Sequence, residues 1–290
     1  MILSLGTAQL GLKYGIANRV GMLSTRQAFE ILDAAWRNDI HALDTAPSYG
    51  KSEERIGKYL RRHPSHDFHV TTKISVLDGT HIDTTSKGSK KRLGKIDSIL
   101  YHCLGCDKQA IDALDPRYAD GISLYNKREI SFTHQGFKSY QMPYSALDQR
   151  NDVAIKYISA IGIKVQARSL LLQGLVAFEP EDCPIVGAAP YLKKLRKIAS
   201  DYSMNIIELC VRWVWELPIS VAIVGAETVK QVEQIAEYYS RGLLPRPLAK
   251  RVYKAGDRKE NIPEMAISPR MWGAHYDFTF KEQGDERGTS

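Results

Sequence analysis

Three short apolar segments in the first third of the chain each end in a side chain that can carry or transfer a proton. Asp44 follows the segment at 41–43, Lys73 ends the segment at 68–73, and His102 ends the segment at 97–102. Tyr49 comes five residues after Asp44. If these segments are neighbouring parallel strands, their carboxyl ends bring a carboxylate, an amine, an imidazole and, on the following loop, a phenol to one place. Together these groups could donate a proton to a carbonyl oxygen, which is enzyme chemistry.

The elements that must position these groups form a regular alternation of strand-like and helix-periodic segments. The expected strands lie at 2–8, 41–46, 68–74, 97–103, 120–125, 139–144, 162–169 and 219–225. Apolar residues at helical spacing predict helices at 24–39, 51–62, 190–202, 205–217 and 228–239, and Ser24 or Thr25 can cap the first of them. Eight strand–helix alternations favour a parallel sheet, and eight such strands can close into a barrel.

We therefore predict an α/β fold, a (β/α)8 TIM barrel, over residues 1–240. No G-x-G-x-x-G pattern follows the first expected strand, which argues against a doubly wound open sheet. From about Arg241 the periodicity fades, and four prolines follow before residue 270. Residues 241–290 are predicted to be a C-terminal extension of loops and short helices with mobile last residues. Whether this extension covers the active-site rim or packs on the barrel side is left open.

Composition narrows the class of protein. The chain has 290 residues, of which 43% are hydrophobic and 25% charged, and a formal net charge of +7. No apolar run approaches the ~18 residues of a membrane helix, and the N-terminus lacks the features of a signal peptide. The four cysteines do not form a disulfide pattern, so we expect a reduced, cytoplasmic protein. The basic run at 87–95 contains no aromatic residue, which favours a solvated helix face over a nucleic-acid site.

A set of ordered motifs resembles a known family. The segments LGTAQLGLKYGIAN, LDTAPSYGKSEERIG, TTK, DSILYH, GISLYN, YQMPYSALDQR, RSLLLQGL and IVGAETVKQVEQ resemble successive signatures of the aldo-keto reductase superfamily. The likeness covers roughly residues 1–240, and DTAPSYGKSE is its most specific part. It implies a (β/α)8 barrel that uses NADPH, with NADH not excluded, to transfer a hydride between nicotinamide and a small carbonyl or alcohol. We expect a polar, sugar-like substrate.

The resemblance also implies a catalytic tetrad of Asp44, Tyr49, Lys73 and His102. During hydride transfer, negative charge grows on the carbonyl oxygen and needs a proton donor. A free tyrosine has a pKa of about 10, and we expect the Lys73 cation to lower that of Tyr49. Asp44 is expected to keep Lys73 charged and oriented, and a neutral His102 to donate a hydrogen bond to the substrate oxygen.

Cofactor contacts implied by the resemblance lie after several strands. They are Gly6 and Thr7 under the nicotinamide, together with Asp44; Ser123 and Gln141 at its carboxamide; Arg168 after the seventh strand; Ser169, Leu170, Gln173 and Gly174 along the pyrophosphate; and Gly225, Lys230, Gln231 and Gln234 after the eighth strand. Two positions depart from the family. Arg168 stands where many members stack an aromatic ring on the nicotinamide. After the eighth strand, Lys230 is the single cation in 225–234, where NADPH-binding members commonly offer Lys or Arg to the 2′-phosphate.

Other interpretations remain open at this point. A barrel lyase or aldolase could use Lys73 as a Schiff-base amine, and a non-catalytic module could bind the cofactor to sense redox state. The C-x-x-C at Cys103 and Cys106 lacks a second Cys/His pair, so we predict no metal site. The remaining expectations concern aromatic residues: Trp213 and Trp215 in helix packing, and Tyr14, Trp272, His275 and Tyr276 at a substrate rim. The substrate, reaction direction and oligomeric state are left open.

Overall fold

Eight parallel strands close a barrel in which each strand pairs with the next and β8 pairs with β1. The computed structural model describes residues 1–75, 82–103, 108–125, 136–256, 262–269 and 272. Within them the strands are β1 (Ile2–Gly6), β2 (Ala42–Asp44), β3 (His69–Ser75), β4 (Ser98–His102), β5 (Gly121–Ser123), β6 (Ser139–Pro143), β7 (Lys164–Arg168) and β8 (Val221–Gly225). The predicted (β/α)8 barrel is confirmed, and each strand lies inside the segment expected for it, except that β3 extends one residue further, to Ser75.

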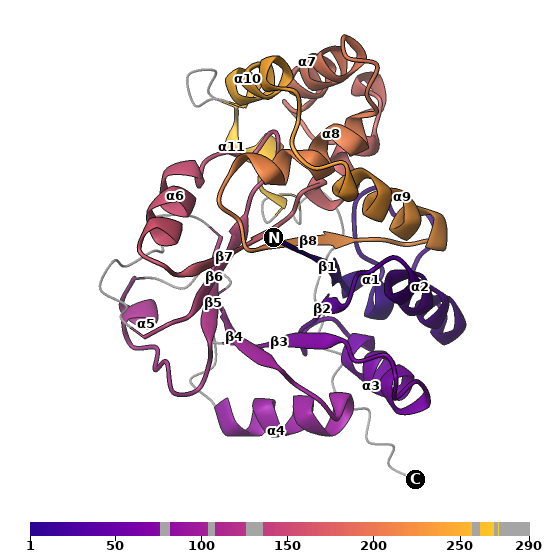
Figure 1. The fold of residues 1–290 in the computed structure, drawn as a ribbon, viewed down its shortest axis with the longest axis vertical. Coiled ribbons are helices and arrows are strands. Elements are labelled where there is room, and N and C mark those ends of the chain that lie inside the picture. Colours follow the sequence, from indigo (N-terminus) through magenta and orange to yellow (C-terminus); the bar gives the residue numbers. More distant parts are fainter. Residues whose placement is uncertain (76–81, 104–107, 126–135, 257–261, 270–271, 273–290) are drawn as a thin grey trace.

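Helices surround the barrel (Figure 1). The first long helix, α2 (Thr25–Arg37), begins at a cap in the sequence, because Ser24 and Gln27 form a reciprocal capping box there. Short 3₁₀ turns accompany the α-helices. In chain order these elements are α1 (Ala8–Gly11), α2 (Thr25–Arg37), α3 (Ser52–Arg62), α4 (Ile82–Leu93), α5 (Lys108–Asp112), α6 (Asp152–Ala160), η2 (Leu172–Ala177), η3 (Pro180–Asp182), α7 (Ala189–Ser200), α8 (Ile206–Arg212), η4 (Trp213–Glu216), α9 (Val229–Ser240), α10 (Arg246–Ala255) and α11 (Glu264–Ile267).

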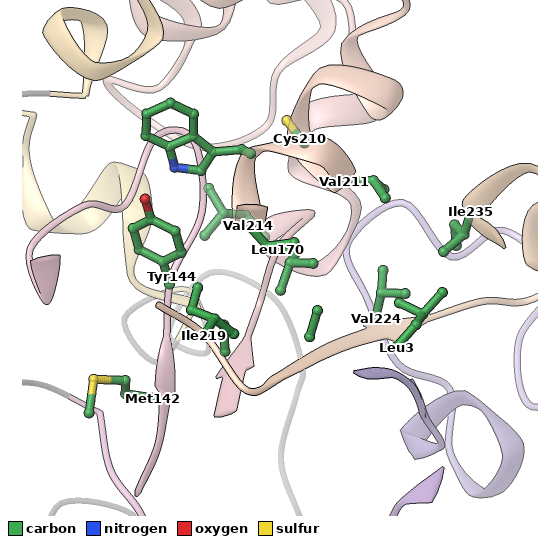
Figure 2. Packing of buried hydrophobic residues seen from close by; sticks show 14 of the residues in the cluster. Leu3, Met142, Tyr144, Leu170, Cys210, Val211, Val214, Ile219, Val224 and Ile235 are labelled. Carbon is green, nitrogen blue, oxygen red and sulfur yellow. The ribbon is translucent and has the colours of Figure 1, made fainter. Parts of the chain in front are cut away.

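The hydrophobic core lies between the outward-facing side chains of the strands and the helices. Figure 2 shows this packing where residues of β8, such as Val224, meet Val211 on α8 and Ile235 on α9. Trp213 is 1% exposed, and its ring stacks at 6.2 Å from that of Tyr144. The predicted packing role of Trp213 is therefore confirmed. Trp215 is half-buried against the same core and donates through Nε1 to a carbonyl of α9, which confirms its role as well.

The C-terminal part contains helices, as expected. In Figure 1, α10 lies beside α7, and α11 follows it in the chain. Trp272 is buried and donates through Nε1 to the Met265 carbonyl at 2.6 Å, so its indole packs inside the fold. His275, Tyr276 and the predicted mobile end lie outside the described residues, as does Cys106. Among the described residues, no helix is both long and apolar enough to cross a membrane.

Candidate active site

Strand register brings six of the predicted residues into two rows at the carboxyl end of the barrel. Gly6 on β1 pairs with Asp44 on β2 and with Gly225 on β8. On the other side, His102, Ser123 and Gln141 pair in sequence across β4, β5 and β6. Residues that are far apart in the chain thus share one edge of the barrel, as expected for parallel strands.

Lys73 lies at the centre of the four predicted catalytic side chains. Its Nζ donates to Asp44 Oδ1 at 2.6 Å, to the Thr45 carbonyl at 2.9 Å and to Tyr49 Oη at 3.5 Å. The rings of Tyr49 and His102 meet edge to face, with centroids 6.4 Å apart. The structure therefore brings all four predicted side chains together, with the phenol directed toward the amine.

Tyr49 reaches this place because the loop at 45–51 closes tightly on α1. Gly11, on α1, has no room for a side chain: a Cβ there would lie 1.9 Å from the Tyr49 carbonyl oxygen and 2.3 Å from the Ser52 nitrogen. The loop is also tied to β1, since Ser52 Oγ donates to Thr7 Oγ1 at 2.9 Å and Thr7 donates to the Asp44 carbonyl. The glycine permits the close approach that fixes the phenol.

Burial dominates the electrostatics of the two most enclosed tetrad members. Lys73 is fully buried and Asp44 is 5% exposed. Desolvation lowers the pKa of Lys73, while the charge and hydrogen bond of Asp44 oppose this effect. The Lys73 ammonium has an oxygen partner for each of its three hydrogens, namely the carboxylate at 2.6 Å and two further acceptors.

The pKa of Tyr49 differs from the sequence-based expectation. It is raised above that of a free tyrosine, first by burial and then by the Asp44 carboxylate, whereas Arg168 acts in the opposite direction. The expected net lowering of this pKa is therefore wrong, because burial and the Asp44 charge prevail. Asp44 balances the Lys73 charge, and the phenol lies farther from Nζ than the carboxylate does. Tyr49 therefore holds its proton in the resting site.

His102 agrees with the expectation of a neutral imidazole. Burial lowers its pKa well below the usual value, and the positive charges of Lys73 and Arg168 add to this effect. A neutral imidazole carries one N–H donor and one acceptor nitrogen. At neutral pH the ring can thus donate one hydrogen bond at the barrel end without adding charge.

Ser123 and Gln141 form a buried polar pair next to Asp44. Ser123 Oγ donates to Gln141 Oε1 at 2.7 Å, and Gln141 Nε2 donates to Asp44 Oδ2 at 2.7 Å. The pair offers a hydroxyl and an amide side by side, which are complementary in hydrogen bonding to a carboxamide. A nicotinamide ring carries such a group, so these residues fit the predicted cofactor.

Arg168 ends β7 and reaches toward the loop after β5. Its guanidinium lies 4.5 Å from the Tyr125 ring centroid and donates to the Leu124 carbonyl at 2.9 Å. The same charge influences the pKa values of Tyr49, Lys73 and His102. A permanent cation therefore lies close to the tetrad at the position where the family resemblance implies an aromatic ring.

The segment after β7 is held in an uncommon backbone conformation. Ser169, Leu172, Gln173 and Gly174 have φ values of 64°, 45°, 52° and 89°. Ile16 donates its backbone N–H to the Gln173 carbonyl at 3.1 Å, so the loop after α1 supports this segment. Such strain clusters at ligand-binding sites. Leu170, by contrast, has its side chain in the core (Figure 2), so any contact that it makes with a cofactor must come from its backbone.

The loop after β8 leads into α9, whose first turn is capped by Thr228. Gln231, predicted to contact the cofactor, accepts from the Glu227 backbone N–H at 2.7 Å and so supports the cap. Lys230 and Gln234 are exposed on α9. A Cβ at Gly225 would lie 2.5 Å from Gln9 Nε2, so the glycine leaves room for the amide of Gln9 beside the strand end.

Two residues near the site were missed by the sequence interpretation. Glu53 on α3 is 1% exposed and accepts hydrogen bonds from Thr72, Ser89 and Arg92 at 2.6, 3.2 and 2.7 Å. It thereby joins α3, β3 and α4 behind Lys73. Tyr125 faces Arg168, as described above, and nothing in its sequence context distinguishes it from other tyrosines.

Comparisons with known proteins agree with this geometry. The model of the Aldo/keto reductase family matches residues 2–254. A D-threo-aldose 1-dehydrogenase from Pseudomonas sp is 42% identical over 77 residues, which span 25% of this chain and 23% of that protein. The aldo-keto reductase str7 of Strobilurus tenacellus is 24% identical over 321 aligned positions, covering 92% of this chain and 94% of the relative.

Solved structures share the barrel. The glycerol dehydrogenase AKR11B4 from Gluconobacter oxydans has a TM-score of 0.68 at 21% identity, covering 87% of this chain and 90% of its own. The aldo-keto reductase AKR11C1 from Bacillus halodurans, in a holo form, has a TM-score of 0.67 at 20% identity, covering 88% and 92%. The match of the family model over nearly the whole chain is decisive: this protein belongs to the aldo/keto reductase family, whose members are oxidoreductases that use nicotinamide cofactors.

Proposed function

We propose that the protein transfers a hydride between NADPH or NADH and the carbonyl or alcohol carbon of a small polar substrate, with Tyr49 as general acid and base. The observation that carries this proposal is the contact of Lys73 Nζ with both Asp44 at 2.6 Å and Tyr49 Oη at 3.5 Å inside a buried site. When bound, the nicotinamide supplies or accepts the hydride.

The protein's own residues handle the charge on the substrate oxygen. In the direction of reduction, Tyr49 donates its phenolic proton as negative charge grows on that oxygen. The positive charges of Lys73 and Arg168 stabilise the phenolate left behind, while Asp44 holds Lys73 in place. Neutral His102 donates one hydrogen bond to the same oxygen and sets its direction. In the reverse direction the phenolate accepts the proton of the alcohol.

Cofactor binding is assigned to the strand ends and loops that flank the four catalytic side chains. Ser123 and Gln141 are proposed to bind the carboxamide, and Gly6 and Thr7 to line the ring. The positive-φ segment at 169–174 and the N-terminus of α9 are proposed to bind the phosphates, because exposed backbone N–H groups favour anions. We keep NADPH as the proposed cofactor on the basis of Lys230, with NADH as the competing one. Glu227 is half-buried at the start of α9 and would repel a 2′-phosphate bound beside it.

A sugar-like substrate is supported by the Pseudomonas relative, whose name describes it as an aldose dehydrogenase.

A Schiff-base reaction at Lys73 is disfavoured, because all three hydrogens of its ammonium have oxygen partners and the side chain is fully buried. The redox-sensing alternative is disfavoured by the four assembled side chains, which cofactor binding by itself does not require.

The test is a screen of aldehydes, ketones, aldoses and polyols with NADPH, NADH and their oxidised forms, followed at the absorbance of the reduced nicotinamide. Turnover with at least one class of polar substrate is expected. Binding of cofactor, measured by quenching of protein fluorescence, without turnover across the panel would favour the sensing module. Trapping of a substrate on Lys73 by borohydride would favour the Schiff-base reaction instead.

A further inference from the structure

A cluster of metal-ligating side chains lies away from the candidate active site, between α2, α3 and the turn that precedes β3. Asp33 on α2, His63 at the end of α3 and His66 in the turn each offer one ligand atom, and these atoms lie within 4.8 Å of one another. Helices α2 and α3 lie side by side at this point (Figure 1). The cluster is at the amino end of β3, whereas Lys73 lies toward the carboxyl end of that strand.

Aromatic side chains hold both imidazoles in place. The His63 ring stacks on Tyr59 with centroids 4.3 Å apart, and the His66 ring stacks on Trp36 with centroids 4.7 Å apart, each at an interplanar angle of 10°. Their Nδ1 edges face the cluster: His63 Nδ1 is 4.0 Å from Asp33 Oδ1, and His66 Nδ1 is 2.7 Å from Tyr59 Oη. Imidazoles oriented in advance in this way lose little freedom when they bind a metal.

The Tyr59 hydroxyl is the present hydrogen-bond partner of Asp33 Oδ1 and His66 Nδ1. It donates to Asp33 Oδ1 at 2.5 Å, so the hydrogen between Tyr59 and His66 belongs to His66 Nδ1. A divalent cation could take the place of that proton at Nδ1. The displaced proton would move to Nε2 of the same ring or to solvent. The phenol keeps its hydrogen in the bond to Asp33 and is therefore neutral, so the three other side chains are the stronger ligands.

We propose that Asp33, His63 and His66 bind one Zn²⁺ ion, with water completing the coordination. Two imidazole nitrogens and one carboxylate oxygen are a ligand set that suits zinc. Bonds of about 2.0–2.1 Å require ligand atoms about 3.4 Å apart, so the cluster must contract slightly. Asp33 and His63 are 38% and 32% exposed, which leaves their side chains free to rotate inward. The ion would join α2 to the turn before β3 and stabilise the barrel without taking part in hydride transfer.

The test uses the full-length protein after treatment with a chelator. Equilibrium dialysis against Zn²⁺, with bound metal measured by mass spectrometry, is expected to give one ion per chain at about 100 μM free Zn²⁺. Thermal unfolding is expected to shift upward by a few degrees with the metal. His63→Gln and Asp33→Asn should each weaken binding about tenfold or more and remove the shift. Asp33→Asn keeps an oxygen that can accept from Tyr59, so the fold should persist.

His69→Gln is the matched control, because His69 is exposed at the start of β3 and is not part of the cluster. It should bind Zn²⁺ like the unaltered protein. Absence of stoichiometric binding would overturn the proposal, as would binding that neither His63→Gln nor Asp33→Asn weakens. Turnover of the nicotinamide cofactor is expected to be the same with and without the metal, so failure here leaves the proposed enzymatic function untouched.

Discussion

Replacing Tyr49 by Phe removes one oxygen atom from the candidate site and little else. The phenylalanine ring keeps the edge-to-face contact with His102 and the position 5.0 Å from Lys73 Nζ. Among the described residues, the hydroxyl is hydrogen-bonded to Lys73 at 3.5 Å, so the loss of this long contact should change the free energy of unfolding by less than about 1 kcal/mol. Stability and cofactor binding should therefore survive the substitution.

Catalysis should not survive to the same degree. A positioned general acid contributes about 10²–10⁴-fold to the rate, which corresponds to about 3–5 kcal/mol of transition-state stabilisation. We expect kcat to decrease by a factor of about 10²–10⁴. The dissociation constant of the cofactor, measured by fluorescence quenching, should change less than about threefold, or ~0.7 kcal/mol.

Tyr118→Phe is the matched control, since Tyr118 is 47% exposed and lies away from the tetrad. It should leave kcat and the cofactor affinity unchanged. If Tyr49→Phe retained kcat within tenfold of the unaltered enzyme while folding normally, Tyr49 could not be the proton donor and the assigned roles of Lys73 and Asp44 would fall with it.

Three further outcomes follow from the structure. Gly11→Ala places a Cβ 1.9 Å from the Tyr49 carbonyl oxygen, so we expect lower thermal stability by calorimetry and lower turnover. Unchanged stability and turnover would show that the loop at 45–51 can move to accommodate the methyl group. Glu53→Ala removes the acceptor of three hydrogen bonds and should cost about 3 kcal/mol of unfolding free energy in urea titrations, whereas the neighbouring exposed Glu54→Ala should cost under about 1 kcal/mol; equal losses would contradict the anchoring role. The pKa of His102 is lowered in the fold, so the unfolded chain binds more protons below about pH 6.5. Stability should decrease as the pH falls through that value, and His102→Gln should weaken the dependence; an identical pH profile for this variant would refute the assignment.

The barrel was predictable because its strands leave a strong local signal. Parallel strands covered by helices are buried on both faces, so segments such as the one at 219–225 are nearly continuous apolar runs. The titratable residues that follow the apolar core positions then indicated the strand ends, although β3 continues two residues past Lys73. Asp44, Lys73 and His102 could be placed at one edge for this reason alone.

Other features depend on packing that a single sequence does not display. Glu53 and Glu54 are adjacent acidic residues at the start of α3, yet one is 1% exposed and the other is on the surface. Their difference comes from the rotation of α3 against α4. The Asp33–His63–His66 cluster has a similar origin: the His-x-x-His spacing at 63–66 is visible in the sequence, but its third member lies on another helix.

In the proposed reaction, the raised pKa of Tyr49 affects the order of proton and hydride transfer. A phenol that burial and Asp44 keep protonated cannot lose its proton to water at neutral pH, so it remains available as an acid until a stronger acceptor appears. The oxygen that receives a hydride becomes such an acceptor, because an alkoxide is a far stronger base than water. Lys73 and Arg168 then face a phenolate in a site with low polarity, where their attraction is strongest. The same burial that opposes ionisation at rest therefore strengthens the stabilisation of the charge once it forms, which ties proton transfer to the arrival of the hydride.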